Sequence, residues 1–316
     1  MKKCVSDDAV SPVVAFMLLL MIVVSFISVL NAYYIPSLKQ QAEIEHLHNV
    51  EQSFLKISSD ILQVLTFRQN MTMTESIQLG GGDVYFSPVK SSGYLEVNTS
   101  LQNNTLYSIN IEVKNETGGI IYHQYSEINR SKIIFRPIGN FWINQSYEWE
   151  DGIINITKGF RKTYLQYLDK DNDKDNDIEK ARSNYYNMSL PWIQLSEYQN
   201  NLTNIVVDIV NIENPLHKRS YSGNGFGSLI VDLKKVKQYR APLNISEKIV
   251  FNIFNSAIDY GVDSIINEKF NRSEGWTNAI WYKDNRTLII KNESVLLEER
   301  KIPDLTINLW NLSFHF

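Results

Sequence analysis

An uncharged, largely apolar stretch runs from Val10 to Leu38 and constrains this chain more than any other feature. A helix of about 20 apolar residues, rising about 1.5 Å per residue, crosses the roughly 30 Å hydrocarbon core of a bilayer. The rest of the 316-residue chain is too polar to follow this stretch into lipid. The sequence therefore predicts one membrane anchor near the N-terminus and a large soluble part.

Three kinds of anchor are distinguished by the residues that flank the stretch. A cleaved secretory signal has an apolar core of about 7–15 residues before a small-x-small site. Here the core is much longer, and the best such site, Leu30-Asn31-Ala32, begins with a large residue. A lipoprotein signal needs its cysteine after the apolar run, but the single cysteine, Cys4, precedes it. A retained N-terminal transmembrane helix fits best.

The segment Asp-Asp-Ala-Val-Ser-Pro-Val-Val, which starts at residue 7, resembles the leader junction of archaeal type IV pilins. The resemblance implies that a prepilin peptidase cuts between Ala9 and Val10 on the cytoplasmic side and leaves Val10 as the new N-terminus. Pro12 suits the first turn of a helix, where no backbone N–H bond is needed. Val14 stands where bacterial pilins carry a glutamate, so the bacterial mode of assembly registry is not implied.

The long helix is expected to continue beyond the membrane. Pro36 predicts a kink and not an end, because it removes one helical hydrogen bond. Residues 37–67 predict an amphipathic helix whose apolar side chains recur at spacings of three and four. The stripe consists of Ile44, Leu47, Val50, Phe54, Ile57, Ile61 and Leu65. The predicted organisation is a leader (1–9), a long helix (10–67, with 10–35 transmembrane) and a head domain (68–316).

Charge and cysteine content limit the function classes. The net charge is −4 and no basic patch stands out, which argues against nucleic acid as a partner. One cysteine excludes an intramolecular disulfide, so the head must rely on its core. Lys2 and Lys3 precede the apolar stretch and favour a cytoplasmic N-terminus and an extracellular head.

Fourteen Asn-x-Ser/Thr sequons follow the long helix, and none lies in the first 69 residues. One interpretation is a glycosylated surface domain; the other is a turn-rich β protein that is simply rich in Asn, Ser and Thr. The sequons begin at Asn70, Asn98, Asn103, Asn115, Asn129, Asn144, Asn155, Asn187, Asn201, Asn244, Asn271, Asn285, Asn292 and Asn311.

From about Thr74 the apolar period changes to two, which indicates strands separated by turns. Strands are predicted at 94–98, 107–113, 120–122, 132–136, 152–157, 204–210, 228–233, 287–291, 294–297 and 305–310. Residues 245–270 return to helical spacing and predict an inserted helix, and Asn224-Gly225 predicts a tight hairpin turn. The predicted fold class is α+β: a long N-terminal helix followed by a β-rich, antiparallel, sandwich-like head.

Part of the head also resembles large pilin-like archaeal surface proteins of unassigned role. The residues concerned are Ile-Gln-Leu-Gly-Gly-Gly at 77–82, Phe-Ser-Pro-Val-Lys-Ser-Ser-Gly-Tyr-Leu at 86–95, Ile-Phe-Arg-Pro at 134–137 and Tyr-Glu-Trp at 147–149. The resemblance implies a β-rich head at these positions and names no ligand.

One acidic run could hold a cation. Asp169, Asp171, Asp173, Asp175 and Asp177 place a carboxylate at every second residue, a spacing that calcium loops use. The run lacks the glycine at position six and the glutamate at position twelve of the helix-loop-helix calcium site. The two interpretations are a calcium loop and a solvated, charge-balanced loop before a short helix at 178–182.

Other polar motifs predict structure more than chemistry. His46 and His48 lie two apart and would point away from each other on a helix, so they do not predict a metal pair. The Gly-Asn-Gly-Phe-Gly segment at 223–227 has no helix after it and does not predict a phosphate loop. The sequence also has no Gly-x-Ser-x-Gly nucleophile elbow, and no cofactor is expected.

The six tryptophans allow two interpretations, core anchors or an exposed adhesive or sugar-binding patch. They are Trp142, Trp149, Trp192, Trp276, Trp281 and Trp310.

The leading hypothesis is a non-enzymatic, type IV pilin-like surface protein, either a minor pilin or a related subunit. Its partners would be the membrane, prepilin peptidase and other pilin-like subunits. The alternatives are a membrane-anchored adhesin that does not polymerise and, more remotely, an anchored extracellular hydrolase.

Overall fold

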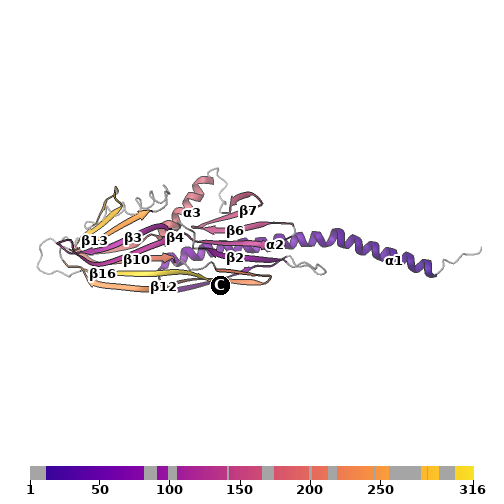
Figure 1. The fold of residues 1–316 in the computed structure, drawn as a ribbon, viewed down its shortest axis with the longest axis horizontal. Coiled ribbons are helices and arrows are strands. Elements are labelled where there is room, and N and C mark those ends of the chain that lie inside the picture. Colours follow the sequence, from indigo (N-terminus) through magenta and orange to yellow (C-terminus); the bar gives the residue numbers. More distant parts are fainter. Residues whose placement is uncertain are drawn as a thin grey trace, which may run out of the picture.

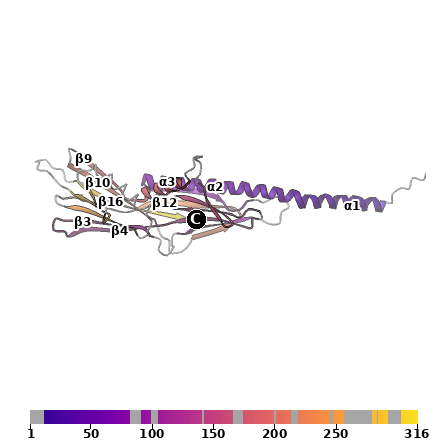
Figure 2. The same ribbon diagram turned by 90° about the horizontal axis from the view of Figure 1, so that it is seen from above.

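The protein consists of a long helix that projects from a β-rich head (Figure 1). The computed structural model describes residues 12–81, 91–98, 105–140, 142–165, 174–198, 201–212, 219–244, 247–255, 279–282, 284–291 and 303–316. The α+β class predicted from the sequence, with one long N-terminal helix before an antiparallel β-rich domain, is confirmed. Viewed from above, the helix leaves the head at one end and extends far beyond it (Figure 2).

The long helix is continuous from Pro12 to Phe67. It comprises α1 (Pro12–Val29), the five-residue π turn η1 (Leu30–Tyr34) and α2 (Ile35–Phe67). Pro36 has no N–H to donate, and the π turn directly before it widens the helix so that the Ile35 N–H bonds to the Leu30 carbonyl. The helix therefore passes through Pro36, as the sequence predicts.

The head contains three sheets, within the described residues. The first, sheet A, has the order β1 (Met71–Gln78), β12 (Phe226–Pro242), β16 (Asp304–His315), β10 (Asn201–Ile212) and β9 (Trp192–Tyr198). Sheet B has the order β11 (Arg219–Gly223), β2 (Ser92–Asn98), β5 (Lys132–Ile138), β6 (Gln145–Glu150), β7 (Ile153–Lys158) and β8 (Arg161–Tyr164). Sheet C has the order β14 (Ala279–Tyr282), β15 (Thr287–Lys291), β13 (Lys248–Asn255), β3 (Thr105–Lys114) and β4 (Ile120–Asn129).

The second half of the long helix forms the spine of the head. It contacts β1 and β12 of sheet A, β6 and β7 of sheet B, and α3 (Lys174–Ser189). Sheet C lies at the far end of the head, where β4 contacts β10 of sheet A (Figure 1). One apolar cluster joins the helix to all three sheets, as alternate residues such as Ile109, Val207 and Phe251 point inward from their strands.

Strands predicted on described residues are present, with one parallel pair, β10 with β16, that the sequence did not predict. The helix predicted at 245–270 is wrong over Lys248–Asn255, which is strand β13; Ile249, Phe251 and Ile253 alternate inward at a period of two. The predicted hairpin at Asn224-Gly225 is also wrong. The turn joins β11 of sheet B to β12 of sheet A, so it carries the chain between two sheets. The segment 294–297 lies outside the described residues.

Candidate functional site: the projecting helix and its attachment to the head

The most unusual surface of the molecule is the projecting helix, defined here as residues 12–34. α1 buries no residue, and fourteen of its eighteen residues are large apolar side chains that are each 46% to 69% exposed. Burying one such side chain fully stabilises by about 1.5–3 kcal/mol, so covering the exposed half of all fourteen is worth on the order of 10–20 kcal/mol. Among the described residues, this is the one helix long and apolar enough to cross a membrane.

Two polar side chains of the projecting helix, Ser28 and Asn31, are bonded within the helix. Ser28 Oγ donates to the Val24 carbonyl at 2.7 Å, and Asn31 Nδ2 donates to the Ile27 carbonyl at 3.0 Å. Each bond reaches back four residues, a pattern that satisfies a polar side chain without a partner outside the helix. In lipid every polar group must find such a partner, so this arrangement suits a hydrocarbon environment.

The head first holds the helix at Glu43. This glutamate is fully buried, and its Oε2 accepts hydrogen bonds from the backbone N–H groups of Trp142 (3.0 Å) and Ile143 (3.2 Å). Both N–H groups belong to the connection between β5 and β6. A buried carboxylate that accepts two N–H bonds is held strongly, because hydrogen bonds to charged groups are worth about 1.5–3 kcal/mol each. The sequence analysis placed Ile44 on the buried stripe and missed Glu43. In the structure Ile44 is exposed and Glu43 is buried.

One turn further on, His46 bonds the helix to the end of β1. Its Nε2 donates to the Gln78 carbonyl at 2.8 Å, and its ring lies edge-on to Phe135. Burial lowers the pKa of His46, while the Gln78 carbonyl and nearby Glu43 oppose this effect. His48 is exposed on the other side of the helix, so the two side chains point apart.

Two aromatic residues of β6 attach the middle of α2 to sheet B. Tyr147 donates from its hydroxyl to the Leu47 carbonyl at 3.1 Å, and Trp149 donates from Nε1 to Ser58 Oγ at 3.2 Å. Both side chains are buried, and the polar group of each has a hydrogen-bond partner inside the core.

The far end of the helix is fixed by Arg68, which adopts a left-handed conformation at φ 46° and ends the helix. Its guanidinium donates to the carbonyls of Asp208 (2.7 Å), Met188 (2.6 Å) and Leu190 (2.9 Å). Burial lowers the pKa of Arg68 to about 10, which leaves it charged at neutral pH. These bonds join α2, α3 and sheet A at one point, so the helix is held at both ends of the head.

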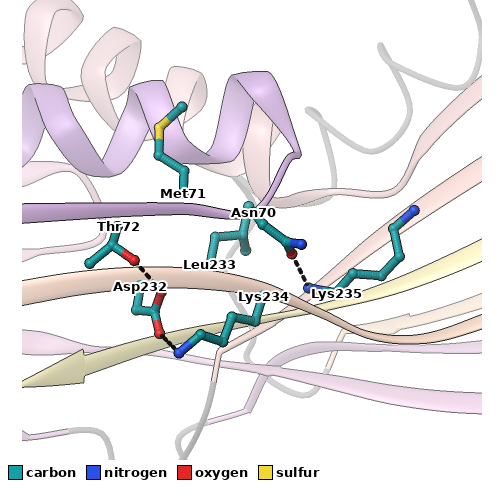
Figure 3. A pocket seen from close by; sticks show the side chains of 7 residues that line it. All are labelled: Asn70, Met71, Thr72, Asp232, Leu233, Lys234 and Lys235. Carbon is teal, nitrogen blue, oxygen red and sulfur yellow. Dashed lines mark hydrogen bonds and ion pairs between the residues drawn. The ribbon is translucent and has the colours of Figure 1, made fainter.

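A surface pocket of about 340 Å³ lies beside this junction (Figure 3). Its polar lining is already paired. Asn70 Oδ1 accepts from the Lys235 N–H at 2.9 Å, Thr72 Oγ1 donates to Asp232 Oδ1 at 2.8 Å, and Lys234 pairs with Asp232 (Figure 3). Lys235 lies over the Trp310 ring at 4.8 Å. The pocket lies where β1 pairs with β12, and its polar side chains are used in bonds between and along these two strands.

The sequons differ widely in accessibility. Asn70, Asn144, Asn244 and Asn285 are exposed, and Asn115, Asn129, Asn187 and Asn311 are partly exposed. In contrast, Asn98 and Asn155 are only 6% and 3% exposed. Asn201 lies on β10, and Asn103, Asn271 and Asn292 lie outside the described residues.

The predicted calcium run is only partly described. Asp175 and Asp177 fall on α3, which begins at Lys174, whereas Asp169, Asp171 and Asp173 lie outside the described residues, as do Ala9 and Val10. Where side chains are described, no three His, Cys, Asp or Glu residues gather to hold a metal ion. The helix predicted at 178–182 exists and is longer, reaching Ser189.

The tryptophans divide between core and surface. Trp149 and Trp310 are buried and Trp281 is partly buried, whereas Trp142 and Trp192 are 50% and 51% exposed. Trp276 lies outside the described residues.

Comparison with known proteins identifies no family for this chain. No protein-family model matches the chain, and neither curated proteins nor solved structures give a match.

Proposed function

We propose that this chain is a non-enzymatic, type IV pilin-like surface protein. Its leader is cut between Ala9 and Val10, and the projecting helix is retained as a membrane anchor that can also pack with other such helices in a surface filament. The head lies outside the cell, consistent with Lys2 and Lys3 before the apolar stretch.

One observation carries this proposal: a continuous helix is apolar and bare along its first half and buried in the head along its second half. On the order of 10–20 kcal/mol of unmet burial excludes water as the resting environment of the first half. A bilayer and a bundle of like helices both supply that burial. The attachments at Glu43 and Arg68 fix the head on the helix. A force on the head, or a change in its position, is therefore transmitted to the helix through a rigid connection.

The cleavage site gives the first experiment. Mass spectrometry of the N-terminal peptide from native membranes should find Val10 as the first residue. Ala9→Leu should block the cut because it replaces the small residue at the junction, and Ala9→Gly is the matched control that keeps a small residue. An intact leader in the wild-type chain would refute the pilin-like assignment and leave a plain anchor.

Polymerisation needs a separate measurement. Surface filaments sheared from cells should contain the protein if the projecting helix enters a filament bundle. A protein that is cut at Val10 but stays entirely in the membrane fraction would instead be a stand-alone anchored binding protein.

A further inference from the structure

The connection between β5 and β6 is an apolar loop placed beside the helix. Its sequence from residue 139 to 144 is Gly-Asn-Phe-Trp-Ile-Asn, which contains no charged residue, and Ile138 precedes it at the end of β5. Ile138 is 47% exposed and Trp142 is 50% exposed. Surface connections are usually polar, so exposed apolar side chains that are held in place suggest a partner surface.

Glu43 determines where this loop lies along the helix. Its carboxylate binds the Trp142 and Ile143 N–H groups, so the loop is level with residue 43. Tyr33 and Tyr34, which are 76% and 57% exposed, lie nine to ten residues nearer the N-terminus. At about 1.5 Å per residue, the loop is about 14 Å beyond these tyrosines along the axis.

The same arithmetic places the loop close to a membrane that the helix spans. Residues 12–34 extend for about 34 Å, whereas the hydrocarbon core is roughly 30 Å thick with about 5–8 Å of headgroup region on each side. With the tyrosines at the interface, an upright helix holds the loop just above the headgroups. The excess length favours tilting, and tilt lowers one side of the head toward the lipid.

We propose that the β5–β6 connection is a second membrane contact, in which Trp142 enters the headgroup region and sets the direction in which the helix tilts. Tryptophan prefers this region because its ring is amphipathic, and interfacial tryptophans are among the groups that fix helix tilt and rotation. The inference rests on the membrane-anchored state of the proposed function. It also accounts for Glu43, a buried carboxylate that accepts two backbone hydrogen bonds from the loop that carries Trp142.

The chain supplies a matched control in Trp192. Its exposure is 51%, against 50% for Trp142. Trp192 pairs with Asp208, whose carbonyl binds Arg68 at the far end of the spine. Arg68 is 25 residues beyond Glu43, so Trp192 lies about 37 Å farther from the membrane along the axis.

The test uses the full-length protein in vesicles made with and without brominated lipids, which quench tryptophan fluorescence on contact. Flotation of the vesicles first establishes anchoring, separately from the loop. Trp142→Phe should lose most of the lipid-dependent quenching, and Trp192→Phe should retain it. Both tryptophans are half exposed and the Glu43 bonds go to backbone N–H groups, so both variants should fold.

Glu43→Gln provides a second variant that leaves Trp142 in place. An amide holds the two N–H groups less strongly than a carboxylate, so the loop should be less fixed and the quenching should fall. Equal quenching in Trp142→Phe and wild type would overturn the proposal in protein that floats. A Trp142 emission that changes only when copies associate would also overturn it and would assign the loop to a neighbouring subunit. Failure to float would refute the anchoring itself.

Discussion

Asp151 offers a direct test of how burial controls stability in the head. Asp151-Gly152 forms the two-residue turn between β6 and β7, with φ values of 49° and 82°. This is the arrangement for which Asp-Gly and Asn-Gly are favoured, because both positions need positive φ. Asp151 is only 2% exposed, and its Oδ2 lies 3.3 Å from the Tyr186 hydroxyl and 3.8 Å from Arg130 Nε.

Burial raises the pKa of Asp151 to about 6; Glu150 adds to this effect, and Arg130, Tyr186 and Arg182 oppose it. The folded state therefore binds the proton more tightly than the unfolded chain, whose carboxyl keeps a pKa near 3.8. The stabilising contribution is fully present below pH 4 and is lost as the pH rises through 6. A shift of about two pKa units corresponds to about 3 kcal/mol.

Asp151→Asn should remove this dependence, because asparagine suits the turn, keeps an acceptor for Tyr186 and does not titrate. Urea unfolding of the full chain in mild detergent at pH 4 and at pH 7 gives the free energy of unfolding of both proteins. The difference between variant and wild type should move in favour of the variant by about 2.5 kcal/mol from pH 4 to pH 7, because the unfolded carboxyl is already partly ionised at pH 4. Since other groups titrate in both proteins, they cancel in this difference. An unchanged difference across the range would refute the reasoning.

Three other predictions concern Arg68, Gly152 and the sequons. Arg68→Met should lower the free energy of unfolding by about 3 kcal/mol or more, because three buried carbonyls lose a charged donor, and Arg68→Lys should recover part of it in the same urea assay. Gly152→Ala should cost about 2 kcal/mol or more, since a Cβ at φ 82° would lie 2.6 Å from Tyr185 Cβ; a wild-type unfolding midpoint would contradict this. If the head is glycosylated after folding, glycopeptide mapping should find glycan on exposed Asn285 and none on Asn155.

Much of the fold is predictable because the period of the apolar residues reports the local structure. The stripe from Leu47 to Leu65 has helical spacing, and its members are buried on α2. Tyr107 to Val113 alternates and forms β3 in sheet C. In both cases the buried face alone determines the pattern, so no information from distant residues is needed.

The errors arise where one spacing fits two structures or where a distant partner decides. Ile249 and Ile253 are four apart, which fits both a helix and a strand, and only pairing with β3 and β15 makes the segment a strand. Asn224-Gly225 has the local chemistry of a hairpin turn. Its two flanking strands nevertheless pair with β2 and β1 of different sheets, a choice made by long-range contacts that the dipeptide does not encode.

Glu43 illustrates why the candidate site itself was harder to predict than the fold. Glu43 lies three residues before His46 and four before Leu47, so it continues the buried stripe. A charged residue at such a position nevertheless predicts an exposed side chain unless its partner is known. The partners are backbone N–H groups at Trp142 and Ile143, a hundred residues away. Every residue except proline has a backbone N–H group, so the sequence does not show which of these groups binds Glu43. An apolar partner would be visible in the pattern of apolar residues. A charged residue in line with an apolar stripe is therefore the sequence signal for such a buried charge, and Lys39, one turn before Glu43, is buried in the same way.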